Sequence, residues 1–244
     1  MTLPTAQTLY DVIDGTWPAA EYIPLGPLTL RRGNGGGQRV SATTARQPVR
    51  ADEQTVIDDA ETAMRDMGQP CLFMIREGQD DLDRILAERG YDIVDPVNLY
   101  AAPIADMATD RPPRVSALLA WEPLEIMREI WEQGGIGENR INVMHRAKGP
   151  KTGVIGRIND HPAGACFCAI HDGVAMVHAL EVLPHQRGQK MGSYAMRELA
   201  FWARDKGAQS MATICTRSNT GANALYTSLG MTLVGQYHYR KLKE

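Results

Sequence analysis

The chain has 244 residues, of which 43% are hydrophobic and 23% are charged, and its formal net charge is −3. This composition is typical of a globular protein with a buried core. The small net charge argues against a general nucleic-acid binder, which would carry a basic excess. No apolar run approaches the roughly 18 residues of a membrane span, and the first residues, MTLPTAQTLYD, show no secretory signal. We expect a cytoplasmic protein that binds neither nucleic acid nor membrane.

The first half begins with two expected strands, LTLRR (28–32) and RVSATT (39–44), which the glycine-rich segment GNGGGQ would join as a hairpin. Residues 51–68 follow as an amphipathic helix, acidic on one side and apolar on the other. No Arg/Gly-rich turn precedes this helix.

Two stretches of the chain resemble each other. Residues 71–102 and 212–242 each read as a strand, a turn, a helix, a glycine with a large apolar residue, and a second strand. Gly90 corresponds to Gly230 at an offset of 140 residues, and both glycines are plausible helix C-caps. The polar, proline-bearing segment 105–114 suits a linker. We therefore expect related domains at residues 1–104 and 115–244.

The second half begins with two expected helices, at 123–135 and 138–147, and continues with strands at 152–158, 163–170 and 174–182. The turns NDHP and HDG indicate antiparallel hairpins. Cys166 and Cys168 would point to one side of their strand, as reduced core residues, and no His/Cys cluster with ligand spacing surrounds them to form a metal site. A helix, the strand MATICTR, the repeated helix and a final strand YHYRKL complete an α+β domain with a mixed sheet.

A basic, glycine-bearing turn, Arg187 to Gly192, separates the strand at 174–182 from the next helix. A helix N-terminus offers unpaired N–H groups and the positive end of the helix dipole, and glycine lets a ligand approach the backbone. The turn therefore predicts a site for an anion such as a phosphate.

These features resemble the GNAT superfamily of acyl-CoA-dependent N-acyltransferases. The family's phosphate-binding pattern [Q/R]-x-x-G-x-[G/A] reads here Arg187-Gly188-Gln189-Lys190-Met191-Gly192. Its second landmark, N-x-x-A-x-x-L-Y-x-x-x-G-[F/M], is present at Asn219, Ala222, Leu225, Tyr226, Gly230 and Met231. The resemblance implies an α+β fold of two GNAT-like halves, each a mixed, mostly antiparallel sheet flanked by helices. The C-terminal half would be complete and catalytic, and the N-terminal half degenerate.

The resemblance also implies acetyl-CoA as cosubstrate and a set of cofactor-binding residues. The strands at 174–182 and 211–217 would separate and leave a slot for the pantetheine. Main-chain groups of Leu180 and Val182 would face this slot, and the turn would bind the pyrophosphate. Lys190 departs from the family, which usually has glycine there. We expect it in the right-handed helical region, where it would either add charge to a phosphate contact or be a solvated surface residue. The implied cofactor-binding residues are Leu180, Val182, Arg187, Gly188, Gln189, Lys190, Met191, Gly192, Ser193, Asn219 and Ala222. Asn219 is also a plausible N-cap of its helix.

Three residues are candidates for catalysis. The family implies that the Tyr226 hydroxyl protonates the departing CoA thiolate, although Tyr226 also fits a core position. His178 and Glu181 compete for the role of base that removes the proton from the amine. An unperturbed histidine titrates near neutral pH, whereas a carboxylate would need help from its surroundings or a water relay. The two residues point to opposite faces of a regular strand, and a β-bulge between them would bring both to one side.

The resulting hypothesis is an N-acetyltransferase that transfers acetyl from acetyl-CoA to a primary amine by direct attack in a ternary complex. The alternative is a non-catalytic acyl-CoA-binding or scaffolding protein built from GNAT halves. The acceptor cannot be identified from the sequence, and the glycine-rich segment 132–140 is either a rim over its site or a plain loop. The oligomeric state is open; we favour a monomer in which the two halves form an internal pseudo-dimer.

Overall fold

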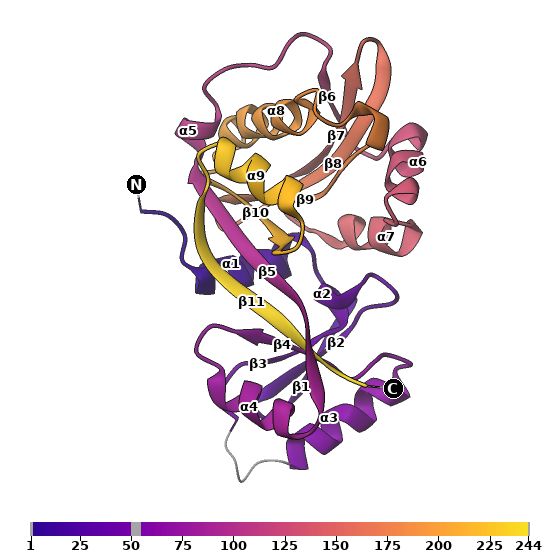
Figure 1. Cartoon of the computed structure of the whole chain (residues 1–244), viewed down its shortest axis with the longest axis vertical. Coiled ribbons are helices and arrows are strands. Elements are labelled where there is room, and N and C mark those ends of the chain that lie inside the picture. Colours follow the sequence, from indigo (N-terminus) through magenta and orange to yellow (C-terminus); the bar gives the residue numbers. More distant parts are fainter. Residues whose placement is uncertain (1, 50–54, 244) are drawn as a thin grey trace. The chain divides into compact units, whose positions relative to one another are not determined.

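The computed structural model describes residues 2–49 and 55–243 and divides the chain into two compact units (Figure 1). Unit 1 holds residues 1–18, 99–215 and 219–234, and unit 2 holds residues 19–98, 216–218 and 235–244. Helices and strands of both pairing directions occur in each unit, which confirms the expected α+β class with a mixed sheet. In the described part of the chain, every helix is too short or too polar to span a bilayer.

Unit 2 is built on a sheet in the order β1 (Glu21–Leu25), β2 (Leu28–Arg32), β3 (Thr43–Ala45), β4 (Leu72–Arg76) and β11 (Thr232–Leu242). The β3–β4 pair is parallel and the other pairs are antiparallel. Helices α3 (Thr55–Asp66) and α4 (Asp80–Glu88) bury their apolar residues in its core. Residues 51–54 of the helix expected at 51–68 lie outside the described residues.

The strand expected at 39–44 is wrong over its first part. Residues 38–41 form a short helix, α2 (Gln38–Ser41), and strand pairing with β2 involves only Thr44 and Ala45. The helical turn buries the Val40 side chain, and the Ala42 N–H donates to the Gln38 carbonyl at 2.8 Å. Burial of one side chain and a local backbone hydrogen bond thus replace the first part of the strand ladder.

The sheet of unit 1 runs in the order β5 (Tyr91–Pro103), β10 (Ser210–Thr216), β9 (Val174–Val182), β8 (His161–His171), β7 (Lys151–Ile158) and β6 (Ala117–Ala120). β10 is parallel to β9, and the strands from β9 to β6 are antiparallel. The expected helices are present as α6 (Glu125–Gln133), α7 (Glu138–Arg146), α8 (Met191–Asp205) and α9 (Thr220–Ser228). The secondary structure expected in the second half is therefore confirmed.

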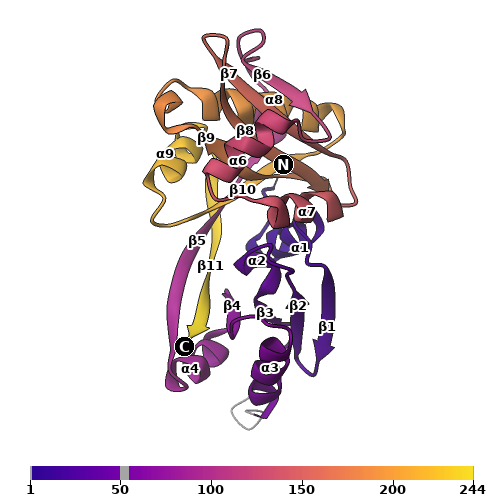
Figure 2. The ribbon, with the colours of Figure 1, turned by 90° about the vertical axis from the view of Figure 1, so that its right-hand side faces the viewer.

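The two faces of this sheet are covered by different helices. Residues of α8 and α9 pack with Cys166, Cys168 and Val177 in one core cluster, and α6 lies on the other side, in front of the strands in Figure 2. Helix α1 (Ala6–Thr16), which our sequence analysis missed, also packs against β8 and β9. Cys166 and Cys168 are buried free thiols, as expected.

The last strand of each repeat, β5 in the first and β11 in the second, has residues in both units. Unit 1 includes residues 99–103 of β5, and unit 2 includes residues 235–242 of β11. In unit 1, the Tyr100 hydroxyl donates to Asn223 Oδ1 at 2.8 Å; in unit 2, Arg240 Nε donates to Asp83 Oδ1 at 2.7 Å. The offset of 140 residues relates these two pairs, which supports the repeat read from the sequence.

The compact units differ from the domain boundaries expected at residues 104 and 115. Residues 1–18 belong to unit 1, and so does segment 105–114. This segment includes most of the short helix α5 (Ile104–Met107) and packs on α8. Arg197 pairs with Asp110 at 3.2 Å, and the Arg111 guanidinium lies 4.3 Å from the Phe201 ring centroid. Residues 105–114 are therefore held by side-chain contacts. The origin of the two halves as separate domains stays a prediction from the repeat.

Candidate active site

Strand β9 carries the expected bulge. Phe167 pairs with His178 and Ala165 pairs with Glu181, so β9 has one residue more than β8 between these pairs. Ala179 takes up the irregularity with a φ of 52°. Beyond it, Leu180 and Val182 pack against the core under α8, which leaves Glu181 on the same face of the sheet as His178.

Glu181 lies beneath the junction of α6 and α7. A Cβ added to Gly134, at the end of α6, would lie 2.7 Å from the carboxyl group of Glu181, so this glycine lets the segment 132–140 approach the carboxylate closely. Glu181 Oε1 accepts a hydrogen bond from Arg187 Nη2 at 3.2 Å. Arg187 also donates from Nε to the Val182 carbonyl at 3.1 Å. Arg187, expected at the pyrophosphate, therefore bonds to β9 in this structure.

His178 is 3% exposed and is enclosed by residues from the start of the chain. Its Nε2 lies 2.8 Å from the Thr16 hydroxyl, and its ring centroid lies 5.1 Å from that of Trp17. Our sequence analysis did not find Thr16 or Trp17. The signal was present in the helical spacing of Leu9, Val12, Ile13 and Thr16, which are all buried in α1.

The Tyr226 side chain is buried in the core between α9 and the sheet, with 4% exposed. Burial raises the pKa of this phenol to about 12, against the opposing effect of a side-chain hydrogen bond with Thr213. Thr213 in turn donates its hydroxyl proton to the Val177 carbonyl at 3.2 Å. Tyr226 is therefore a core residue that also has a polar partner on β10.

Thr213 and Val177 mark the point where β9 and β10 separate. The two strands pair from Val174–Ser210 to Val177–Thr213, whereas β9 continues to Val182 and β10 to Thr216. The divergence matches the slot that we expected between these strands. Thr213, which affects the pKa of Tyr226, lies at the fork where the slot begins.

The turn before α8 has an unusual backbone. Gly188 has a φ of 76° with no atom within 4 Å of an added Cβ, and Lys190, the N-cap of α8, has a φ of 66°. The right-handed conformation expected for Lys190 is therefore wrong, because the chain enters the helix here through the left-handed region. This region favours glycine, which gives a physical reason for the usual residue of the family at this position.

The N-terminus of α8 suits a phosphate group. Its first turn contains no acidic residue, and among the described residues no side chain caps it by a hydrogen bond. The helix dipole and the amides of Met191, Gly192 and Ser193 can then act on an anion. Gly192 has a second reason to be glycine, since an added Cβ would lie 2.7 Å from Leu225 Cδ2 of α9. These residues fit the pyrophosphate of acetyl-CoA.

The other expected cofactor-binding residues lie around this turn and at the start of α9. Gln189 is exposed and donates to Gln186 at 2.9 Å, whereas Met191 is buried in the core. Asn219 is the N-cap of α9 and accepts from the Ala222 N–H at 3.0 Å, which confirms its capping role. Contacts of these residues with the cofactor remain predictions.

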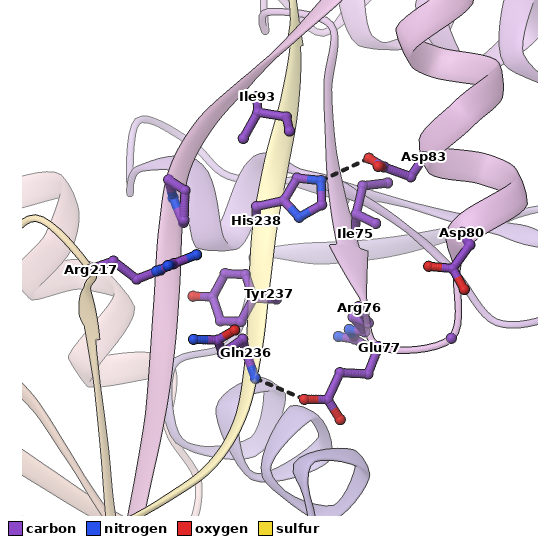
Figure 3. Close-up of a pocket in the computed structure, with 12 residues that line it drawn as sticks. Ile75, Arg76, Glu77, Asp80, Asp83, Ile93, Arg217, Gln236, Tyr237 and His238 are labelled. Carbon is purple, nitrogen blue, oxygen red and sulfur yellow. Dashed lines mark hydrogen bonds and ion pairs between the residues drawn. The ribbon is translucent and has the colours of Figure 1, made fainter.

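Unit 2 has a separate cavity of about 280 Å³ that contains none of the expected site residues (Figure 3). Its lining mixes acidic, basic and apolar side chains, several of which bond to one another. His238 Nε2 lies 2.7 Å from Asp83 Oδ1, and the Gln236 N–H donates to Glu77 at 3.0 Å. We therefore assign this cavity no part in the candidate active site.

Residues 117–231 match the acetyltransferase (GNAT) family. This segment of the chain belongs to the family. It is an acetyltransferase by this membership, and the GNAT fold generally serves acyl transfer from acetyl-CoA.

Several similar proteins extend the comparison to the whole chain. An uncharacterized N-acetyltransferase, YobR, from Bacillus subtilis (strain 168) is 24% identical over 235 residues, or 92% of this chain and 94% of YobR. A GCN5-related N-acetyltransferase from Kribbella flavida has a TM-score of 0.76 at 20% identity, covering 98% of this chain and 96% of its own. A tandem GNAT protein from the clavulanic acid biosynthesis pathway has a TM-score of 0.60 at 15% identity, covering 87% and 76%. The tandem GNAT arrangement is consistent with this last structure.

Proposed function

We propose that the chain transfers an acetyl group from acetyl-CoA to a primary amine by direct attack in a ternary complex. The observation that carries this proposal is the position of the Tyr226 hydroxyl at the fork between β9 and β10, beside Thr213. A protonated phenol there can act on a thioester that lies in the slot between the strands. The domain at residues 115–244 would perform the reaction, and the domain at residues 1–104 would be degenerate.

The cofactor would be held by backbone groups on two elements. The α8 amides of Met191, Gly192 and Ser193 would bind the pyrophosphate, with Gly188 leaving room for it. Main-chain groups of Leu180 and Val182 would face the pantetheine beyond the bulge. Lys190 is exposed and would add positive charge near the phosphates.

In the chemical step, the amine nitrogen attacks the thioester carbonyl carbon, and the carbon–sulfur bond breaks. The amine loses a proton to a base, and the departing thiolate takes a proton from Tyr226. Because its pKa is raised to about 12, the phenol keeps its proton at neutral pH and can donate it. Glu181, His178 or a water relay would serve as base; both side chains lie on one face of the sheet.

The test is release of the CoA thiol from acetyl-CoA in the presence of a library of primary amines. We expect release that depends on both an amine and the enzyme, and that is strongly reduced in Tyr226→Phe. Binding of acetyl-CoA without amine-dependent release from any member would instead support the non-catalytic acyl-CoA-binding or scaffolding alternative.

A further inference from the structure

We propose that Thr16 is a positioning residue for His178, and that its hydroxyl group fixes which imidazole nitrogen carries the proton. Helix α1 thereby becomes a part of the catalytic unit, although it lies outside the matched residues 117–231. The inference rests on the proposed function, in which His178 lies close to the reacting groups.

The contacts of α1 show that it is built into unit 1. Leu9, Val12 and Ile13 are buried, and the helix packs against β8 and β9. Gly15 approaches the ring of His171 so closely that an added Cβ would collide with it. The position of Thr16 is therefore set by the core of the unit.

The hydrogen bonds of Thr16 determine the tautomer of His178. The Thr16 hydroxyl has a single proton, which it donates to the Val12 carbonyl at 2.6 Å. Its oxygen can therefore only accept in the 2.8 Å contact with His178 Nε2, so Nε2 carries a hydrogen. In the neutral imidazole, the lone pair then lies on Nδ1.

Aromatic rings hold the imidazole in this orientation. The centroid of the His178 ring lies 5.1 Å from Trp17 and 6.2 Å from Phe167, with interplanar angles of 38° and 27°. Thr16 itself is 0% exposed, so no bulk water replaces its oxygen as acceptor. If His178 is the base, Nδ1 is the atom that receives the proton of the amine, directly or through a water molecule.

The first measurement is the ¹⁵N NMR spectrum of the histidine rings in the full-length protein, with His178 assigned by its absence in His178→Gln. Protonated and bare ring nitrogens resonate at distinct frequencies. We expect the Nε2–H tautomer in the wild type and in Thr16→Ser, which keeps a hydroxyl. Thr16→Val leaves Nε2–H without this acceptor, and we expect the population of the Nδ1–H tautomer to rise.

The second measurement is steady-state kinetics with an amine from the library. Since positioned base catalysis contributes about 10²- to 10⁴-fold, we expect Thr16→Val to lower kcat by at least about tenfold with the KM for acetyl-CoA unchanged. Thr16→Ser should restore most of kcat. Thr8 is an exposed threonine on the same helix, so Thr8→Val is the matched control for replacing a threonine by valine in α1.

The two readouts separate the failure of this inference from failure of the proposed function. An Nδ1–H tautomer in the wild type, or wild-type kcat in a folded Thr16→Val protein, would overturn the positioning role. If no amine is acetylated, the proposed function fails, and the spectra still test whether Thr16 fixes the ring. Thermal unfolding of each variant shows whether a loss of kcat merely reflects a loss of structure. Recovery of kcat in Thr16→Ser would show that the hydroxyl group, and not the packing of α1, is responsible.

Discussion

Tyr226 is a core residue to which the proposed function also gives a chemical role. Its ring lies in the core, 5.6 Å from the ring of Tyr100, and its hydroxyl reaches Thr213 at the fork of the strands. The sequence shows the tyrosine in a family motif on an apolar helix face. It does not show that the hydroxyl has a polar partner at the end of the β9–β10 ladder, because that partner is distant in sequence.

Tyr226→Phe should lower kcat by about 10²- to 10⁴-fold, the usual contribution of positioned acid catalysis. The reduction can be smaller because a CoA thiolate leaves readily near neutral pH. The affinity for acetyl-CoA should barely change, because the lost interaction acts mainly in the transition state. Steady-state kinetics and calorimetric binding of both proteins check this result. Equal kcat values, with chemistry shown to be rate-limiting, would make Tyr226 only a core residue.

The raised pKa of Tyr226 makes a prediction about pH. Burial moves it from an ordinary value of 10 to about 12, so the phenol remains protonated throughout the window between these values. The stability gained from holding this proton is present below pH 10 and is lost as the pH rises through about 12. Any fall in kcat between pH 8 and about 10 should therefore occur equally in wild type and Tyr226→Phe. A fall confined to the wild type would show that Tyr226 titrates earlier.

Lys190 has a left-handed backbone conformation and a positive charge. Three substitutions separate the effect of the backbone on stability from the effect of the charge on acetyl-CoA affinity. Lys190→Gly should raise the free energy of unfolding by about 0.5–1 kcal/mol, because glycine relieves the left-handed backbone at an entropic cost. Lys190→Gln should weaken acetyl-CoA affinity slightly by removing an exposed positive charge, whereas Lys190→Glu should weaken it more by repelling the phosphates. Chemical denaturation and calorimetry measure these effects. Equal affinity for the Gln and Glu variants would place the phosphates elsewhere.

At the scale of elements, local patterns predicted some features and long-range contacts decided others. The cap at Asn219 and the helices α6 to α9 follow from spacing and turn residues, and the bulge in β9 follows from the family resemblance. The structure has all of these features. Other features depend on tertiary packing. One is the bond between Arg187 and Glu181, and another is the close approach of Leu225 to Gly192, where an added Cβ would collide with it. No periodicity in one segment can indicate such partners. The apolar spacing of helix α1, in contrast, predicts an amphipathic helix. The sequence does not indicate that this helix packs beside β8 and β9.

The fragment of residues 115–244 tests the role of the elements that precede it. It lacks α1 and residues 99–103 of β5, which belong to unit 1. Without them, the His178 side of β9 loses its cover, and β10 loses a neighbouring strand. We expect the fragment to be insoluble or to unfold without cooperativity, as monitored by circular dichroism and calorimetry beside the full chain. A soluble fragment with the stability of the full chain would contradict this role.

At the scale of the whole molecule, the repeat is present in structure but its two copies differ in chemistry. The pairs Tyr100–Asn223 and Asp83–Arg240 occupy corresponding positions, yet only the second copy is preceded by the turn from Arg187 to Gly192. Moreover, α4 has three acidic residues in its first turn, whereas α9 has none. A phosphate would be repelled at the start of α4. We therefore predict one cofactor site in the chain, in unit 1.

Calorimetric titration of the full-length protein with acetyl-CoA tests this central claim most directly. The predicted result is a single site per chain, with affinity weakened more by Lys190→Glu than by Lys190→Gln and retained in Tyr226→Phe. Two equivalent sites per chain, or no binding by the folded wild-type protein, would contradict the account of one cofactor held at the N-terminus of α8.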